Sequence, residues 1–206
     1  REAKLLARLE HPNIVRVIRF FQNLFGSPAF VMEYVEGEHV EDMVRTVGNL
    51  PPLQAVNMMC QLLDGLDYAH SNGIVHRDLK PENLMWIPHE GINGVLKILD
   101  FGIAKKAEGI KTSAGPRKTA GAVGTPFYMA YEQYGLGDTA SSWKTDLWAW
   151  GVILWEMLSG TIPFPGRTAT EVMGSVFQKD LPAIKMPAAL ENRLSDKPVS
   201  YTHLRA

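Results

Sequence analysis

Side chains that could act together on a phosphate group lie between residues 76 and 100. Residues 76–83 read His-Arg-Asp-Leu-Lys-Pro-Glu-Asn, which brings Asp78, Lys80 and Asn83 close together in the chain. Asp100 follows in the triplet Asp-Phe-Gly. A carboxylate can hold an attacking hydroxyl, an ammonium can offset the charge of a phosphate in transfer, and amide and carboxylate oxygens are ligands that Mg²⁺ accepts. Groups of these types are compatible with chemistry on a phosphate.

Length and composition predict a globular chain with a full hydrophobic core. Of its 206 residues 46% are hydrophobic, and 21 Lys and Arg balance 22 Asp and Glu for a net charge of −1. This balance offers no basic surface, so we expect no nucleic-acid partner. The most apolar stretch, residues 147–158, is shorter than the roughly 20 residues that a bilayer span needs, so we expect no membrane segment. The single cysteine, Cys60, fits a reducing compartment, and we expect a cytoplasmic protein.

Hydrophobic periodicity and turn residues predict the elements that must position these side chains. We expect helices over residues 1–10, 40–47, 52–71, 144–159 and 169–178, and strands over 14–21, 29–35, 84–86 and 95–99. Residues 87–94 predict a long hairpin connection. In the helix over 52–71, the expected buried face consists of Leu53, Val56, Met59, Cys60, Leu63 and Leu66. On that face Cys60 is expected to serve packing.

The two motifs, in this order, resemble the catalytic core of a protein kinase. The first motif is long enough that a chance match is implausible. The resemblance implies an α+β, bilobal protein-kinase-like fold, with a partial β-rich small lobe over residues 1–35 and a mostly α-helical large lobe over 36–195. Residues 196–206 match no kinase element and are either a divergent native loop or a non-native tail.

The resemblance also implies catalytic roles. Asp78 would hold the attacking hydroxyl, Lys80 would neutralise charge near the transferring phosphate, and Asn83 and Asp100 would hold Mg²⁺. The Lys-Pro-Glu filling of the loop resembles serine/threonine kinases. The segment over 124–130 resembles the part of these kinases that positions a Ser or Thr acceptor, with Thr125 near Asp78 and Lys80. Taken alone, Gly-Thr-Pro is equally compatible with an ordinary turn.

ATP is the phosphate donor that the resemblance implies. Residues 30–35 resemble the last strand of the small lobe and the hinge that follows it. The backbone of Glu33 and Val35 would hydrogen-bond adenine, and Met32 would control the depth of the pocket. Met85 would contact adenine from the large lobe.

Further positions resemble regulatory elements. Glu2 resembles the acidic residue of the regulatory helix, although a first-turn glutamate favoured by the helix dipole is the simpler interpretation. Within 102–130, which resembles an activation segment, Thr119 is expected to carry an activating phosphate that Arg77 would bind, with Thr112 and Ser113 as further candidates. A hydrophobic column between the lobes would consist of Leu6, Val17, His76 and Phe101. Asp146 would anchor the catalytic loop.

The chain departs from the family pattern in two places. A glycine-rich phosphate loop and a phosphate-binding lysine would be expected before Arg1, and no Gly-x-Gly-x-x-Gly pattern occurs in the 206 residues. We therefore expect the 206-residue polypeptide by itself to be inactive. Tyr131 stands where the family has the proline of Ala-Pro-Glu, which puts the local turn in doubt, while Glu132 keeps the acid.

Three functions compete. The leading one is a serine/threonine protein kinase that acts on protein substrates. The alternative is a pseudokinase or scaffold that binds without turnover, which would not need Asp78, Lys80, Asn83 and Asp100 together. A small-molecule phosphotransferase is disfavoured by the segment over 124–130.

Overall fold

The computed structural model describes residues 6, 8–22, 28–90, 93–101, 126–134 and 142–178. Its strands are β1 (Val17–Gln22), β2 (Pro28–Met32), β3 (Glu38–His39), β4 (Leu84–Pro88) and β5 (Gly94–Ile98). Its α-helices are α2 (Val40–Val47), α3 (Pro52–Ser71), α5 (Trp143–Ser159) and α6 (Ala169–Gln178). Three short 3₁₀ helices complete the set: η1 (Pro81–Asn83), η2 (Pro126–Tyr128) and η3 (Tyr131–Tyr134).

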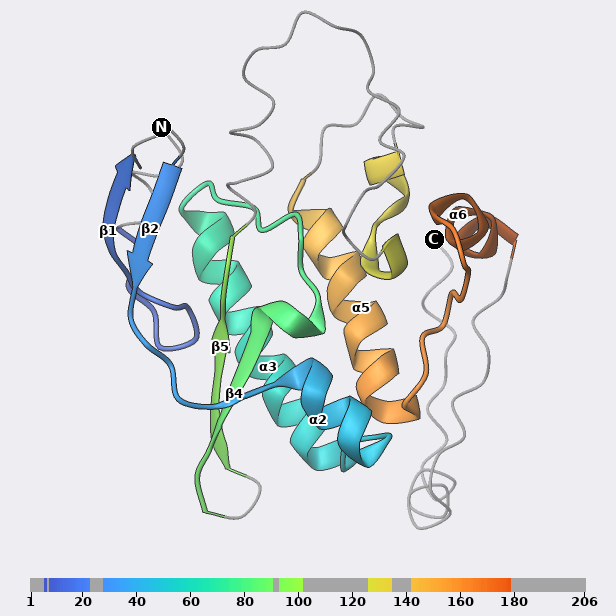
Figure 1. Cartoon of the computed structure of the whole chain (residues 1–206), viewed down its shortest axis with the longest axis horizontal. Helices are drawn as coiled ribbons and strands as arrows, with labels where there is room; N and C mark the ends of the chain where they lie inside the picture. The colour runs from blue at the N-terminus through green and yellow to red at the C-terminus, as the bar shows by residue number, and fades with distance from the viewer. Residues whose placement is uncertain are drawn as a thin grey trace, which may run out of the picture.

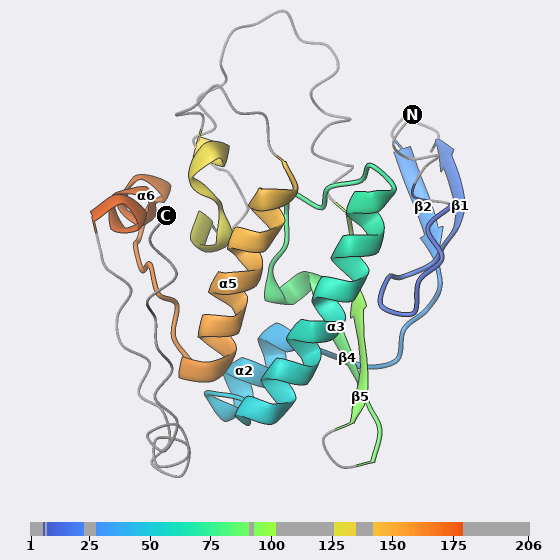
Figure 2. The same ribbon diagram turned by 180° about the vertical axis from the view of Figure 1, so that it is seen from behind.

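The elements form two parts, a β-hairpin and a larger helical body. Strands β1 and β2 pair antiparallel, with Val17 opposite Met32, and stand at one side of the molecule (Figure 1). In the body, α3 and α5 pack against each other, and Figure 2 shows both helices from the other side, with α2 beneath them. The antiparallel sheet β3-β4-β5 covers α3, which it contacts through β5. A β-rich part beside a mostly helical part is the expected α+β, bilobal arrangement.

The predicted elements of the body are confirmed at close to the expected bounds. Helix α2 occupies the expected residues, α3 and α6 begin and end where the periodicity places them, and α5 begins one residue early. Strand β4 ends at Pro88 and β5 begins at Gly94, and these two residues form the last pair before the connection of the β4-β5 hairpin. In the expected helix over 1–10, only Leu6 and residues 8–10 are described.

The buried face of α3 differs from the prediction. The buried residues are Ala55, Met58, Met59, Leu62, Gly65, Leu66 and Ala69. Leu53 is 65% exposed, Val56 is 49% exposed and Cys60 is exposed, so the packing role expected for Cys60 is wrong. Because α3 carries apolar residues on most of its circumference, periodicity does not distinguish its faces, and the small residues that admit close neighbours decide which one is buried. At Gly65, an added Cβ would lie 2.8 Å from the Ile98 side chain on β5.

Helix α5 has a defined start and end. The hydroxyl of Ser142 accepts a hydrogen bond from the N–H of Lys144, which caps the first turn. The last turn closes through Gly160, whose φ of 69° lies in the left-handed region that glycine adopts at low cost. Along its length the indole Nε1 of Trp150 donates to the carbonyl of Met59 at 3.0 Å, which fixes α5 against α3.

A buried asparagine joins the segment before β1 to the helical body. The amide nitrogen of Asn13 donates to Oε1 of Gln61 on α3 and to the carbonyl of Leu96 on β5, both at 2.8 Å. The backbone continues the junction, since the N–H of Ile98 donates to the Asn13 carbonyl and the N–H of Val15 donates to the Ile98 carbonyl. The hairpin therefore starts from a fixed point on α3 and β5.

Among the described helices, none combines the length and the apolar composition that a membrane crossing would require.

Candidate active site

The motif over residues 76–83 forms a loop after α3 and ends in η1, and a buried histidine orders the loop. His76 has no exposed surface. Its Nδ1 accepts the N–H of Asp78 at 3.3 Å, and its Nε2 lies 3.0 Å from the carbonyl of Leu99. Burial lowers the pKa of His76, although the nearby Asp146 carboxylate opposes this effect. The imidazole is therefore neutral, with its proton on Nε2, where a carbonyl can accept it.

Asp146, at the start of α5, binds the backbone of the same loop. Its side chain has no exposed surface, and its two oxygens accept the backbone N–H groups of His76 and Arg77 at 2.9 and 2.8 Å. The Nε2 of His70 on α3 approaches the same carboxylate to 2.7 Å. These bonds hold Arg77 at a φ of 64°, a left-handed conformation that non-glycine residues rarely adopt. The anchoring contacts expected of Asp146 are present.

The predicted magnesium ligands lie next to each other. The amide nitrogen of Asn83 donates to the carbonyl of Asp78 at 2.8 Å, so the amide oxygen of Asn83 is the atom left to face a metal. The N–H of Leu99 donates to the carbonyl of Asn83 at 2.8 Å, which brings Asp100 beside Asn83. An amide oxygen and an exposed carboxylate are hard ligands, so this pair fits Mg²⁺.

Lys80 of the catalytic loop lies near the segment that begins at residue 126. The ammonium of Lys80 lies 3.6 Å from the carboxylate of Glu82. A pocket is lined on one side by Asp78 and Lys80 and on the other by Tyr128 and Met129. The catalytic loop and the acceptor-like segment therefore share a surface, although Thr125 itself lies outside the described residues.

Tyr128 is fixed at this surface by a carboxylate on α5. Its hydroxyl donates to Oε2 of Glu156 at 2.6 Å. Burial raises the pKa of Tyr128, and the charge of Glu156 adds to that effect. Burial also raises the pKa of Glu156, while the hydrogen bond from Tyr128 lowers it in part. The segment that begins at η2 is thereby attached to the last turn of α5.

Tyr131, which replaces a proline of the family pattern, is compatible with the local turn. Residues 131–134 form the 3₁₀ helix η3, and the ring of Tyr131 meets that of Phe177 on α6 edge to face at 5.0 Å. Glu132 accepts a hydrogen bond from the hydroxyl of Thr145 at 2.8 Å. Contacts with α5 and α6 thus support the turn where proline is missing.

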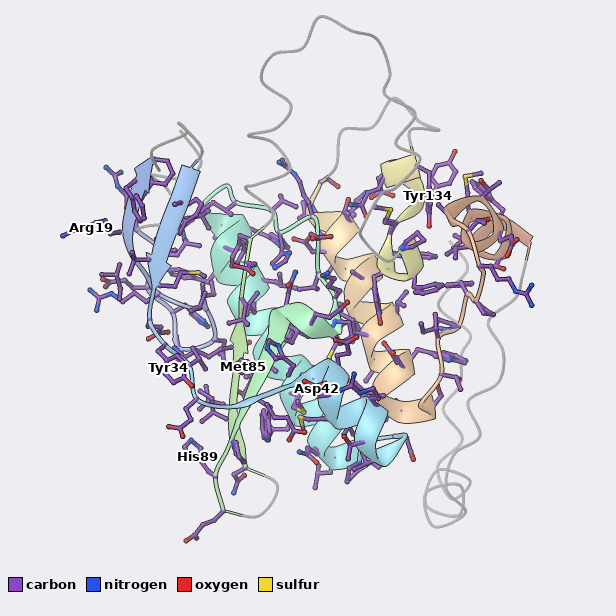
Figure 3. All side chains as sticks on the ribbon, viewed as in Figure 1. Arg19, Tyr34, Asp42, Met85, His89 and Tyr134 are labelled. Carbon is purple, nitrogen blue, oxygen red and sulfur yellow. The ribbon has the colours of Figure 1, made fainter. Side chains whose placement is uncertain are left out.

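The residues predicted to contact adenine lie in or beside residues 33–37, the link that joins the hairpin to the helical body. Met32 ends β2 and is 38% exposed, Glu33 and Val35 follow it, and Met85 lies in β4 opposite His39. In Figure 3, Tyr34 marks this link and Met85 marks the sheet. The N–H of Glu33 donates to the carbonyl of Arg16 at 3.0 Å, which leaves the carbonyl of Glu33 as its backbone group for an adenine amine.

An ion pair spans the same link. The ammonium of Lys97 on β5 lies 2.6 Å from Oε1 of Glu33, which also accepts the N–H of Arg16 at 3.1 Å. Partial burial raises the pKa of Glu33, but the bonds from Lys97 and Arg16 outweigh it, so the pKa lies below the usual value. Glu33 is therefore ionised at neutral pH.

Parts of the predicted regulatory set are described. The rings of Phe101 and His76 lie 4.8 Å apart, and Phe101 and Leu6 belong to one buried hydrophobic cluster. Val17 lies half-buried in β1. Glu2, Thr112, Ser113 and Thr119 lie outside the described residues, so the ion pair and the phosphate site expected there stay predictions.

Two residues at the site had no sequence-based prediction. His70 precedes the motif by six residues, and a polar residue on the inner side of α3 was the available signal. Gln133 contacts the catalytic loop from η3, and a lone glutamine in a short segment carries no recognisable signal.

Comparisons with known proteins identify the family. The family model of the protein kinase domain matches residues 1–201. The chain is 40% identical over 171 residues to the serine/threonine-protein kinase pkn3 of Myxococcus xanthus, covering 82% of this chain and 30% of that protein. It is 37% identical over 175 residues to the serine/threonine-protein kinase PknB of Mycobacterium leprae, covering 84% of this chain and 27% of that protein. The chain thus spans about a third or less of these curated relatives.

A solved structure shows the same fold. A crystal structure of Rad53 residues 1–466 in complex with AMP-PNP superposes with a TM-score of 0.65 and 30% sequence identity, covering 85% of this chain and 41% of that one. The family match extends over nearly the whole chain, and the relatives share the serine/threonine type. The chain therefore belongs to the protein kinase family.

Proposed function

We propose that the protein containing this chain transfers the γ-phosphate of ATP to serine or threonine hydroxyls of protein substrates. The observation that carries the proposal is the hydrogen bond from the Asn83 amide to the Asp78 carbonyl, with Leu99 joined to Asn83 on its other side. Through it, three residues with the required chemistry share one small region. ATP is the phosphate donor in this reaction. We also propose that the protein is cytoplasmic.

Each group has a distinct part in this reaction. Asp78 orients the attacking hydroxyl, and Lys80 offsets the charge that develops on the transferring phosphate. Asn83 and Asp100 hold Mg²⁺, which when bound neutralises phosphate charge. The carbonyl of Glu33 and the backbone of Val35 bind adenine between Met32 and Met85. In this proposal residues 1–35 belong to the small lobe and 36–195 to the large lobe.

Regulation in this proposal depends on residues 102–130. A phosphate on Thr119 binds Arg77 of the catalytic loop, and Thr125 positions the acceptor. The ring of Phe101 contacts that of His76 in a tilted arrangement and couples this segment to the loop. Glu2 pairs with a lysine of the small lobe.

The Asp78→Asn variant tests the proposal in the protein expressed from its full reading frame. We expect turnover of a Ser/Thr peptide to fall by at least a hundredfold, with ATP binding largely retained, because the amide cannot hold the hydroxyl as the carboxylate does. Asp64→Asn, an exposed change on α3, is the matched control and should keep full turnover. Unchanged turnover in Asp78→Asn would contradict the assignment. ATP binding without any transfer by the unaltered protein would support the pseudokinase instead.

The 206-residue polypeptide by itself should show negligible transfer. It contains no Gly-x-Gly-x-x-Gly pattern to cover the phosphates, and we propose that the missing loop and lysine adjoin it in the whole protein. Radiolabelled ATP with Mg²⁺ and a mixed peptide library provides the assay. Robust Mg²⁺-dependent transfer by this polypeptide would refute the expectation.

A further inference from the structure

The peptide bond between Arg77 and Asp78 is held at both of its polar groups by side chains. Its N–H, which belongs to Asp78, donates to Nδ1 of His76 at 3.3 Å. Its carbonyl, which belongs to Arg77, accepts a hydrogen bond from Nε2 of Gln133 at 2.8 Å. This peptide leads directly to Asp78, so its orientation sets the direction in which the Asp78 side chain leaves the backbone.

The conformation of Arg77 makes this support necessary. A φ of 64° places Arg77 in the left-handed region, which is unfavourable for a non-glycine residue. Such a conformation persists only when surrounding contacts determine it. Asp146 holds the N–H of Arg77 and Gln133 holds its carbonyl, so the residue is fixed from both sides.

The other end of the Gln133 amide binds the acceptor-like segment. Its Oε1 accepts the N–H of Ala130 at 2.9 Å, and the N–H of Gln133 donates to the carbonyl of Ala130 at 2.9 Å. The side-chain amide of Gln133 thus faces the carbonyl of Arg77 and the N–H of Ala130. Only one orientation of the amide donates to the first and accepts from the second. Gln133 also lines the pocket that Asp78 and Lys80 share with Tyr128 and Met129.

We propose that Gln133 is a positioning residue that orients Asp78 and sets its distance from the segment that receives the acceptor. The proposal rests on the proposed phosphoryl transfer. Gln133 touches neither substrate nor metal in this role and acts through the Arg77 carbonyl and the Ala130 N–H. Its removal should therefore affect the chemical step and acceptor binding while sparing ATP.

Two variants separate the two hydrogen bonds. Gln133→Glu keeps an oxygen for the Ala130 N–H but places a carboxylate oxygen against the Arg77 carbonyl. Gln133→Met keeps the length of the side chain and removes both bonds. Gln54→Met, on the first turn of α3 and distant in the chain from the catalytic loop, is the matched control.

Steady-state kinetics on the protein from its full reading frame provide the first measurement. We expect kcat to fall about tenfold to a hundredfold in both Gln133 variants, since a small misplacement of a catalytic group has effects of that size. The KM for ATP should change less than twofold. The KM for the peptide should rise in Gln133→Met more than in Gln133→Glu. A wild-type kcat in both variants, or an equal rise in both KM values without loss of kcat, would overturn the proposal.

Amide hydrogen exchange of residues 76–80 provides a readout that does not depend on activity. Both variants should exchange faster there than the wild type, while Gln54→Met should not, and thermal unfolding shows whether each variant remains folded. A wild-type protein that transfers no phosphate would overturn the proposed function. Unchanged exchange of residues 76–80 in both folded variants would overturn the role of Gln133, whatever the activity.

Discussion

His70 and Asp146 join the end of α3 to the start of α5 beneath the catalytic loop. The Nε2 of His70 lies 2.7 Å from Oδ2 of Asp146, whose side chain is completely buried. The same carboxylate accepts two backbone N–H groups of the loop. A buried carboxylate needs all of these partners, because each one replaces part of its lost hydration.

Removing the histidine should therefore weaken the fold. In His70→Ala we expect the free energy of unfolding to fall by about 2 kcal/mol, the size typical of a hydrogen bond to a charged group. His89→Ala, at the exposed tip of the β4-β5 hairpin (Figure 3), should change it by less than about 0.5 kcal/mol. Urea unfolding followed by circular dichroism measures both. Equal effects of the two variants would show that His70 contributes nothing to the Asp146 site.

The Glu33–Lys97 pair should make the stability of the link depend on pH. The pKa of Glu33 is lower in the folded protein than in the unfolded chain, so folding favours the ionised form. Its contribution is present above the unfolded value of about 4.3 and is lost as the pH falls through the lower folded value. Comparing acid unfolding of the wild type with Glu33→Gln should show a smaller pH dependence below pH 5 in the variant. Identical acid profiles would contradict this.

His76 should produce a second pH dependence, at higher pH. Burial lowers its pKa in the folded state, so below about pH 6.5 the unfolded chain gains a proton that the folded protein resists. The neutral, buried His76 contributes fully to stability above that pH. This contribution decreases as the pH falls toward the pKa of His76 in the folded protein. In His76→Gln, whose amide can also donate and accept, the loss of stability between pH 7 and pH 5 should be smaller. Thermal unfolding across this range tests the difference, and a steeper loss in the variant would exclude a neutral, buried His76.

Asn13 should matter for the attachment of the hairpin. Asn13→Ala leaves the carbonyl of Leu96 and the Oε1 of Gln61 short of a donor, and we expect a loss of about 1–3 kcal/mol in the free energy of unfolding. Asn93→Ala, an exposed change at the β4-β5 turn, serves as the control. Chemical unfolding measures the loss, and limited proteolysis should show earlier cleavage between residues 13 and 35. A loss below about 0.5 kcal/mol would mean that water replaces the missing amide.

The sequence by itself determined the family, the order of the elements and the chemistry of the loop. Proline at the start of α3 and the apolar spacing within α3 and α5 are local signals, and they placed these helices nearly to the residue. The motif over 76–83 and Asp100 predict the groups for phosphoryl transfer, because these residues resemble a family pattern in type and in order.

The tertiary structure alone decided which face of α3 is buried and what holds the loop. Cys60 and Leu53 are exposed because β5 and α5 pack on other sides of α3, β5 on the side where Gly65 leaves room. The left-handed Arg77 depends on Asp146 and Gln133, which lie more than 50 residues away in the chain. Local propensity disfavours that conformation, so only contacts formed by the folded chain can select it.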